Sequence, residues 1–182
     1  MELFEHTPNG RLLVYDPITQ KTTTLLSGLY FANGVALSSD ESFVLVNETL
    51  MYRIQKYWLK GDKAGTSEIF IENLPGFPDN VSSNEEGIFW VALFNPRNNF
   101  VEMSSNKPFL RKIVFRLPEL LQPQPINHSF VLGLNEDRKV VHNLQYQASE
   151  AYSPITSVKQ YNDILYFGSL THPGWGKIEV PK

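Results

Sequence analysis

The sequence predicts an all-β fold, a β-propeller made of repeated sheets, and three observations predict it. Short runs rich in Val, Ile, Thr, Tyr and Phe recur along the chain, separated by turn residues. Residues 52–59 alternate apolar and polar positions, which is typical of a half-buried strand. A segment made of a polar start, an acidic turn and a hydrophobic strand occurs three times.

The expected strands follow one another at short intervals, and turn signals such as Asp-Pro, Ser-Gly and Asn-Pro close many of them. In chain order the runs are RLLVY (11–15), KTTTLL (21–26), GVAL (34–37), FVLV (43–46), YRIQKYWL (52–59), SEIFI (67–71), GIFWVAL (87–93) and ILYFGS (164–169). Their lengths and spacing favour antiparallel sheets.

Residues 95–125 depart from this pattern. Phe109, Ile113 and Leu117 recur at intervals of four residues, which predicts a short amphipathic helix that begins near Pro108 and ends before Pro118. Prolines then interrupt the following residues. We therefore expect residues 95–125 to be an insertion between two strands of one sheet, inside a single domain that spans residues 1–182.

The three-fold repetition sets the architecture. Residues 33–47, 79–93 and 156–170 align when Asn33 is placed on Asn80, and these two residues are 47 positions apart. This period is typical of propeller blades, each a four-stranded sheet. At roughly 45 residues per blade, the chain has room for about three blades and an N-terminal piece. We expect a partial propeller whose open sheet edges favour self-association.

Composition excludes several classes of function. With 182 residues and 42% hydrophobic residues the chain has the composition of a globular domain. A net charge of -3 and the lack of a basic tract speak against nucleic acid as a partner. The absence of cysteine excludes disulfides and thiolate metal sites. The N-terminal residues MELFEHTPNGRLL show neither a signal peptide nor a membrane anchor, so we expect this chain to be soluble.

Asn33, Asp79 and Asn80 are the candidate metal ligands. They stand at the start of the expected innermost strands, where side chains face the propeller axis. Carboxylate and amide oxygens are hard ligands of the kind that calcium prefers, and calcium takes six to eight of them. The alternative is plain turn chemistry, because Asn-Gly and Pro-Asp-Asn are also common turn sequences. The residues alone leave both interpretations open.

Longer motifs carry a family resemblance. FANGVALSSDESFVLVNET, RIQKYWLKGDKAGTSEIFIENLPGFPDN and LYFGSL together resemble the strictosidine synthase-like family, in particular its members of the adipocyte plasma membrane-associated and hemomucin types. The similarity extends from about residue 10 to residue 180. It implies a six-bladed propeller related to paraoxonases and to calcium-dependent gluconolactonases, and a membrane-anchored protein with a lumenal or extracellular propeller.

The resemblance also implies a chemistry. In the calcium-dependent relatives, the Asn of the ANG motif and the Asp-Asn pair of the PDN motif bind the catalytic calcium, which here implies Asn33, Asp79 and Asn80. Their other ligands come from blades that would precede this chain, so we expect an incomplete site. The full-length protein is expected to be a calcium-dependent arylesterase or lactonase that acts on a small-molecule ester or lactone. Strictosidine synthesis is not expected, because Thr156 stands where the synthase has its catalytic Glu.

The remaining candidates are weaker. Glu48 is expected either to line the channel or to lie in a solvated turn, and His172 either at the channel mouth or in a solvated loop. Sequons make Asn127 and Asn47 candidate glycosylation sites. Two other functions stay open: a non-catalytic binding or adhesion propeller at the cell surface, and an inactive truncated isoform.

Overall fold

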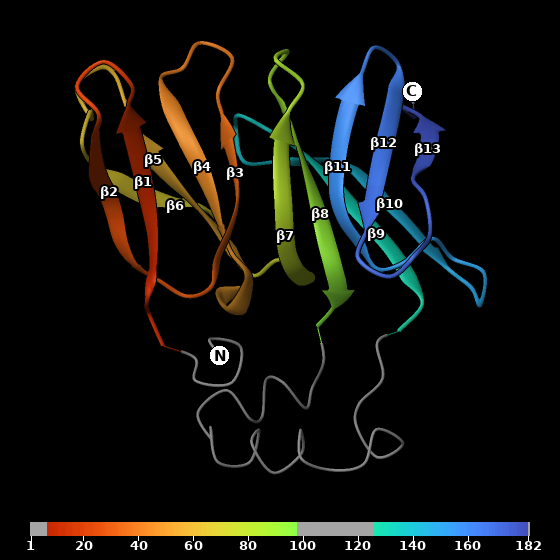
Figure 1. Ribbon diagram of the computed structural model, residues 1–182. Helices are drawn as coiled ribbons and strands as arrows, with labels where there is room; N and C mark the ends of the chain where they lie inside the picture. The colour runs from red at the N-terminus through yellow and green to blue at the C-terminus, as the bar shows by residue number, and fades with distance from the viewer. Residues whose placement is uncertain (1–6, 98–125, 182) are drawn as a thin grey trace.

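The structure is a computed structural model that describes residues 7–97 and 126–181, and in these ranges strands dominate (Figure 1). The all-β prediction is confirmed. The elements are β1 (Gly10–Asp16), β2 (Lys21–Leu29), β3 (Ala32–Leu37), β4 (Phe43–Glu48), the 3-10 turn η1 (Thr49–Met51), β5 (Arg53–Trp58), β6 (Ser67–Ile71), β7 (Gly76–Ser83), β8 (Ile88–Pro96), β9 (His128–Asn135), β10 (Val140–Gln147), β11 (Ile155–Tyr161), β12 (Ile164–Ser169) and β13 (Gly176–Glu179).

The strands form four antiparallel sheets that stand side by side in Figure 1. Their orders are β1-β2, β3-β4-β5-β6, β7-β8-β9-β10 and β11-β12-β13. Consecutive strands are neighbours within every sheet, which is the arrangement of propeller blades. The first strands of the last three sheets, β3, β7 and β11, lie next to one another and are called the inner strands below.

Alternating side chains of one sheet fill the space on both of its faces. In β8, Phe89 and Val91 pack against the β3–β6 sheet, while Trp90 packs against the β11–β13 sheet. In β4, Leu45 faces the β7–β10 sheet and Val46 faces the first hairpin. Successive strand residues point to opposite faces, so apolar runs such as FVLV and IFWVAL identify strands buried on both sides.

The inner strands β7 and β11 are joined by the side chains of alternate residues from the second half of β7 into the turn that follows it. Asn80 Nδ2 donates to Thr156 O at 2.9 Å, and Ser82 Oγ donates to Val158 O at 2.7 Å. Asn84 Nδ2 donates to Gln160 Oε1 at 3.2 Å. Each bond joins residues 76 positions apart, so residues 80–84 and 156–160 are aligned in one regular register.

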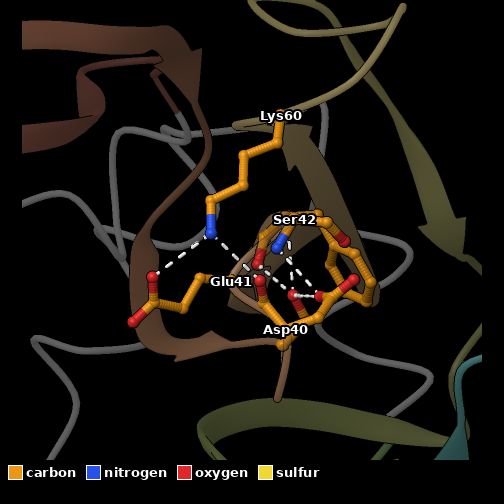
Figure 2. Close-up of polar contacts among 6 residues, drawn as sticks. Asp40, Glu41, Ser42 and Lys60 are labelled. Atoms are coloured by element: carbon orange, nitrogen blue, oxygen red, sulfur yellow. Dashed lines mark hydrogen bonds and ion pairs between the residues drawn. The ribbon is translucent and has the colours of Figure 1, made fainter.

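The predicted hairpin turns are confirmed in all three repeats. Glu41, Glu85 and Asn162 lie in the three turns and have positive φ values of 56°, 66° and 50°. Figure 2 shows the first turn, where the carboxylate of Asp40 accepts hydrogen bonds from Ser42 N at 2.9 Å and from Ser38 Oγ at 2.8 Å. Lys60 Nζ bridges the Glu41 carboxylate and Asp40 O, at 3.3 and 3.1 Å.

Strand boundaries depart from the expectation in two places. β8 extends to Pro96, so the chain is still in a strand where the insertion was expected to begin. Strands β9 and β10 occupy residues to which the sequence pattern assigned no strand. The helix expected from Pro108 to Leu117 lies outside the described residues, and the single domain over residues 1–182 stays a prediction.

Candidate functional site

Each inner strand carries an irregularity at the same place. In β3 the pairing with β4 shifts across Asn33 and Gly34, and in β7 the pairing with β8 shifts across Asp79 and Asn80. In β11 the extra residue is Thr156. A β-bulge of this kind leaves residues outside the ladder, bends the strand and re-aims its side chains. The bulges therefore place the predicted ligands at equivalent positions of neighbouring sheets.

The turn interpretation of these residues is wrong. Gly34 lies inside β3, where a Cβ atom would lie 2.5 Å from Asn80 Cα, so glycine is needed for the close approach of two backbones. Pro78 lies inside β7 next to the bulge, where a strand tolerates a residue without an N–H group. Both segments are bulged strands.

The three predicted ligand side chains are brought together around the carboxylate of Asp79. Asn80 Nδ2 donates to Asp79 Oδ1 at 3.3 Å. Burial raises the pKa of the Asp79 carboxyl above its ordinary value, while a hydrogen bond from the Asn33 side chain acts in the opposite direction. A half-buried carboxylate between two amide groups from neighbouring sheets is an environment that a cation would stabilise.

Two side chains from the neighbouring sheet support this bulge, and the sequence pattern had assigned them no such role. Thr49 Oγ1 donates to Pro78 O at 2.6 Å, and Asn47 Nδ2 donates to Asp79 O at 2.7 Å. Thr49 Oγ1 also accepts a hydrogen bond from Asn33 Nδ2 at 3.3 Å. The one signal in the sequence is a polar Asn-Glu-Thr at the end of an otherwise apolar strand.

The donor set fits calcium. Its oxygens come from one carboxylate and two amides, which are hard ligands, although calcium takes six to eight in all. Within residues 7–97 and 126–181 no group of three or more His, Cys, Asp or Glu side chains could hold a metal ion, so the candidate site has one carboxylate and otherwise depends on amide oxygens. The calcium role of Asn33, Asp79 and Asn80 stays a prediction.

Sequence comparison adds relatives. The strictosidine synthase family model matches residues 1–62. Protein STRICTOSIDINE SYNTHASE-LIKE 10 of Arabidopsis thaliana is 41% identical over 179 residues, which cover 94% of this chain and 47% of the relative. Adipocyte plasma membrane-associated protein of Bos taurus is 36% identical over 177 residues, covering 94% of this chain and 43% of the relative.

The chain belongs to the strictosidine synthase-like family.

Solved structures support the fold of this family member. A luciferin-regenerating enzyme has a TM-score of 0.56 at 18% identity, covering 88% of this chain and 44% of that one. A calcium-binding regucalcin of Agrobacterium tumefaciens has a TM-score of 0.55 at 15% identity, covering 92% and 47%. A gluconolactonase of Xanthomonas campestris also scores 0.55, at 13% identity, covering 86% and 40%. These likenesses establish a propeller fold of the gluconolactonase and regucalcin type.

The strictosidine synthase-like chain spans just under half the length of the curated relatives it matches. Several of those relatives carry plasma membrane association in their names. In the part of the chain that the structure describes, no helix combines the length and apolar composition needed to cross a membrane.

Glu48 occupies neither of the two environments expected for it in this strictosidine synthase-like chain. Its side chain is fully buried, and it is paired with Arg53. Tyr30 N donates to Oε1 at 3.0 Å, and Gln55 Nε2 donates to Oε2 at 2.9 Å. Both carboxylate oxygens are therefore engaged in joining β4 to β5 and to the segment before β3.

His172 is exposed in the loop after β12, as the solvated-loop alternative expected. Its Nδ1 atom lies 3.1 Å from Pro173 O, and its ring centroid lies 4.6 Å from that of Tyr152. Among the described residues, no hydrogen bond or ring contact joins His172 to Asp79. A catalytic role for His172 or Glu48 stays a prediction without support from this geometry.

The two glycosylation candidates differ in exposure. The expectation that Asn47 is a glycosylation site is wrong. Its side chain is fully buried and donates a hydrogen bond to Asp79 O, so it cannot carry a glycan in the folded protein. Asn127 is exposed just before β9, where its Nδ2 donates to Ser149 O at 3.3 Å. Asn127 therefore remains a candidate acceptor.

A groove of about 650 Å³ begins directly beyond the bulges. Its walls are the second halves of β3 and β7, from Val35 and Val81 onward, and Lys159 of β11 reaches it. Lys159 Nζ donates to Ser83 O at 2.9 Å. Sites for small molecules are commonly concave and about 300–1,000 Å³ in volume.

Lys56 is a buried lysine that the sequence analysis did not predict. Lys56 lies on the inward face of β5, with only 4% of its surface exposed. Its Nζ lies 3.7 Å from the ring centroid of Phe43, 4.4 Å from that of Trp58 and 5.2 Å from that of Phe70. Burial lowers the pKa of Lys56, and the Arg138 charge adds to the shift. The alternation in YRIQKYWL places Lys56 on the face of Ile54, which was the available signal.

Proposed function

We propose that the full-length protein is a calcium-dependent hydrolase of small-molecule esters or lactones. The observation that carries the proposal is the half-buried carboxylate of Asp79, which lies in a bulge between the amide side chains of Asn33 and Asn80. The gluconolactonase and the calcium-binding regucalcin among the structural neighbours support the same chemistry.

The roles of the residues follow from their chemistry. Asp79 would supply the negative charge, and Asn33 and Asn80 would add neutral oxygens from two inner strands. When bound, calcium would supply a Lewis acid that polarises the substrate carbonyl. The groove beyond the bulges, with the apolar side chains of Val35 and Leu37, would receive the remainder of the substrate.

Amine–aldehyde condensation of the strictosidine synthase type is not proposed. Thr156 is the bulge residue of β11, and its hydroxyl donates to Gly168 O at 3.3 Å. A threonine hydroxyl does not titrate near neutral pH and cannot replace a carboxylate acid or base.

The test is hydrolysis of phenyl acetate and of a γ-lactone, with calcium and with EGTA, in the full-length protein and in the 182-residue chain. We expect turnover that depends on calcium and is lost in Asp79→Ala. The exposed Asp62 provides the control variant Asp62→Ala. Turnover that is indifferent to both EGTA and Asp79→Ala would exclude the proposal.

A second candidate is a non-catalytic propeller that binds partners at the cell surface. It is favoured by the engagement of Glu48 with three donors and by the contact of His172 with Tyr152, because neither side chain is directed to the Asp79 carboxylate as a base. Calcium binding without measurable turnover of either substrate would favour this candidate over the hydrolase.

We also propose that the full-length protein is membrane-associated and that its propeller faces the lumen or the extracellular space. The names of the mammalian relatives and the exposed sequon at Asn127 support this location. Its test is the glycosylation prediction given below.

A further inference from the structure

We propose that Thr49 and Asn47 are positioning residues that hold the β7 bulge in the conformation that presents Asp79 to a metal ion. The inference rests on the proposed function for the identity of that ion. It assigns a role to two side chains that come from the neighbouring sheet and that are not themselves among the predicted ligands.

The direction of two backbone carbonyls is the first argument. In a regular strand, consecutive carbonyls point to opposite sides of the strand. Pro78 O and Asp79 O are consecutive, yet both accept hydrogen bonds from the end of the β4–η1 segment, at 2.6 and 2.7 Å. The bulge turns both carbonyls toward the β4–η1 segment, where the side chains of Asn47 and Thr49 provide the two donors.

Burial makes these bonds expensive to lose. Thr49 is 6% exposed and Asn47 is fully buried, and a Cβ atom on Gly34 would lie only 2.7 Å from Asp79 O. Water therefore has little room to replace either donor. Because a buried carbonyl without a partner is unfavourable, removal of a donor favours a different backbone conformation at the bulge.

Asn47 shows that this contact has a cost. Its Oδ1 atom is buried without a hydrogen-bond partner among the described residues, which is unfavourable for a polar atom. A leucine of similar size would avoid that cost but would lack the amide that donates to Asp79 O. The hydrogen bond to Asp79 O therefore explains why an amide side chain, and not an apolar one, stands at position 47.

Thr49 joins the bulge to a ligand of the other sheet. Its single hydroxyl proton is donated to Pro78 O, so its oxygen accepts from Asn33 Nδ2 at 3.3 Å. This bond directs the amide nitrogen of Asn33 toward Thr49. The amide oxygen, which is the predicted metal ligand, therefore points away from Thr49. One hydroxyl thus orients Asn33 and fixes the backbone beside Asp79.

The experiment compares Thr49→Val, which keeps the shape and removes the hydroxyl, with Thr49→Ser, which keeps the hydroxyl. Calcium affinity is measured by titration calorimetry, and bound water is counted from the luminescence lifetime of terbium in H₂O and D₂O. Loss of a partner that orients a ligand typically weakens metal affinity by about 10-fold to 100-fold. We expect this loss in Thr49→Val, with additional water on terbium, and near-native values in Thr49→Ser.

Thermal unfolding in EGTA separates positioning from general stability. A purely structural role would lower the unfolding temperature of Thr49→Val without changing its calcium affinity, and that result would overturn the inference. If Thr49→Val does not fold, Asn47→Leu makes the same comparison, because it removes the donor to Asp79 O. Asp79→Ala tests the proposed function separately. If Asp79→Ala leaves calcium binding unchanged, the proposed function fails. If Asp79→Ala loses calcium binding while both Thr49→Val and Asn47→Leu keep native calcium affinity, only the positioning roles are overturned.

Discussion

At the scale of single residues, the protein buries two charged side chains in opposite ways. Glu48 is surrounded by donors, including the guanidinium of Arg53, whereas Lys56 lies over three aromatic rings. Cation–π contacts of a desolvated ammonium are worth about 2 kcal/mol, and they offset part of the cost of its burial. The alternation in residues 52–59 indicates which face of the strand carries Lys56, but the sequence reveals the partners of neither charge, because they come from other strands.

The carboxylate of Glu48 is predicted to stabilise the fold. We expect Glu48→Gln to lower the free energy of unfolding by about 3 kcal/mol, because removing one charge of a buried pair leaves the other poorly compensated. Urea denaturation near neutral pH measures the change. Glu41→Gln is the control, since the Glu41–Lys60 pair is exposed on both sides, and such pairs contribute about 0–1 kcal/mol. Equal effects of the two substitutions would contradict the prediction.

The turn carboxylate of Asp40 is predicted to make stability depend on acid. Hydrogen bonds lower the pKa of Asp40 to about 2. The largest effect comes from the backbone N–H of Ser42, followed by the side chains of Ser42 and Ser38. Its folded pKa lies below the unfolded value of 3.8, so its stabilising contribution is complete above 3.8 and is lost as pH falls toward 2. Wild type should therefore exceed Asp40→Asn in urea midpoint near neutral pH, and the difference should shrink through this window. A difference that does not change with pH would contradict this assignment.

At the scale of elements, the repeated bulge is the feature that organises the site. The alignment of Asn33 with Asn80 could be made from the sequence, and the structure places both residues, together with Thr156 of β11, at strand irregularities. The bulges themselves could not be predicted from the sequence. In a bulge, two residues of one strand lie opposite one residue of the next, and this depends on how the two strands pair. Asn47 and Thr49 were missed for the same reason, since their role depends on carbonyls of another sheet.

The contact between β3 and β7 is predicted to tolerate no side chain at position 34. We expect Gly34→Ala to lower the free energy of unfolding by about 1–3 kcal/mol, because the added Cβ would meet the Asn80 and Val81 backbone at 2.5 Å. Gly176→Ala is the matched control, since its added Cβ would meet its neighbours at an ordinary 3.5 Å. Thermal unfolding of both variants checks the prediction, and similar losses would argue against a tight β3–β7 approach.

At the scale of the whole molecule, the described sheets form adjacent blades of a propeller fold. Its sheets, inner strands and cores follow one repeating plan, which is why the β class and the repeat could be predicted from hydrophobic runs and turn residues. Strand β10 was missed because it is mostly exposed and lacks a strong apolar pattern, whereas the apolar run FVLGL in β9 was a usable signal. Motif similarity, not periodicity, provided the family.

The location of the whole protein is predicted to be visible at Asn127. If the propeller enters the secretory pathway, Asn127 should carry a glycan, because its sequon is exposed before β9. Treatment of the full-length protein from eukaryotic cells with a glycosidase should increase its gel mobility, and Asn127→Gln should remove the component due to this site. Asn47→Gln should not alter that component, since Asn47 is buried. A wild-type protein with no glycan on Asn127 would contradict this prediction.

The alternate-residue bonds between β7 and β11 have a consequence for evolution and for protein engineering. A slip of one residue would break the bonds of Asn80, Ser82 and Asn84 together, so these bonds oppose such a slip. The placement of Thr156 beside Asn80 is then determined where the strands meet, and not by how many residues connect them. Homologues can gain or lose residues between these strands while the axis keeps its geometry.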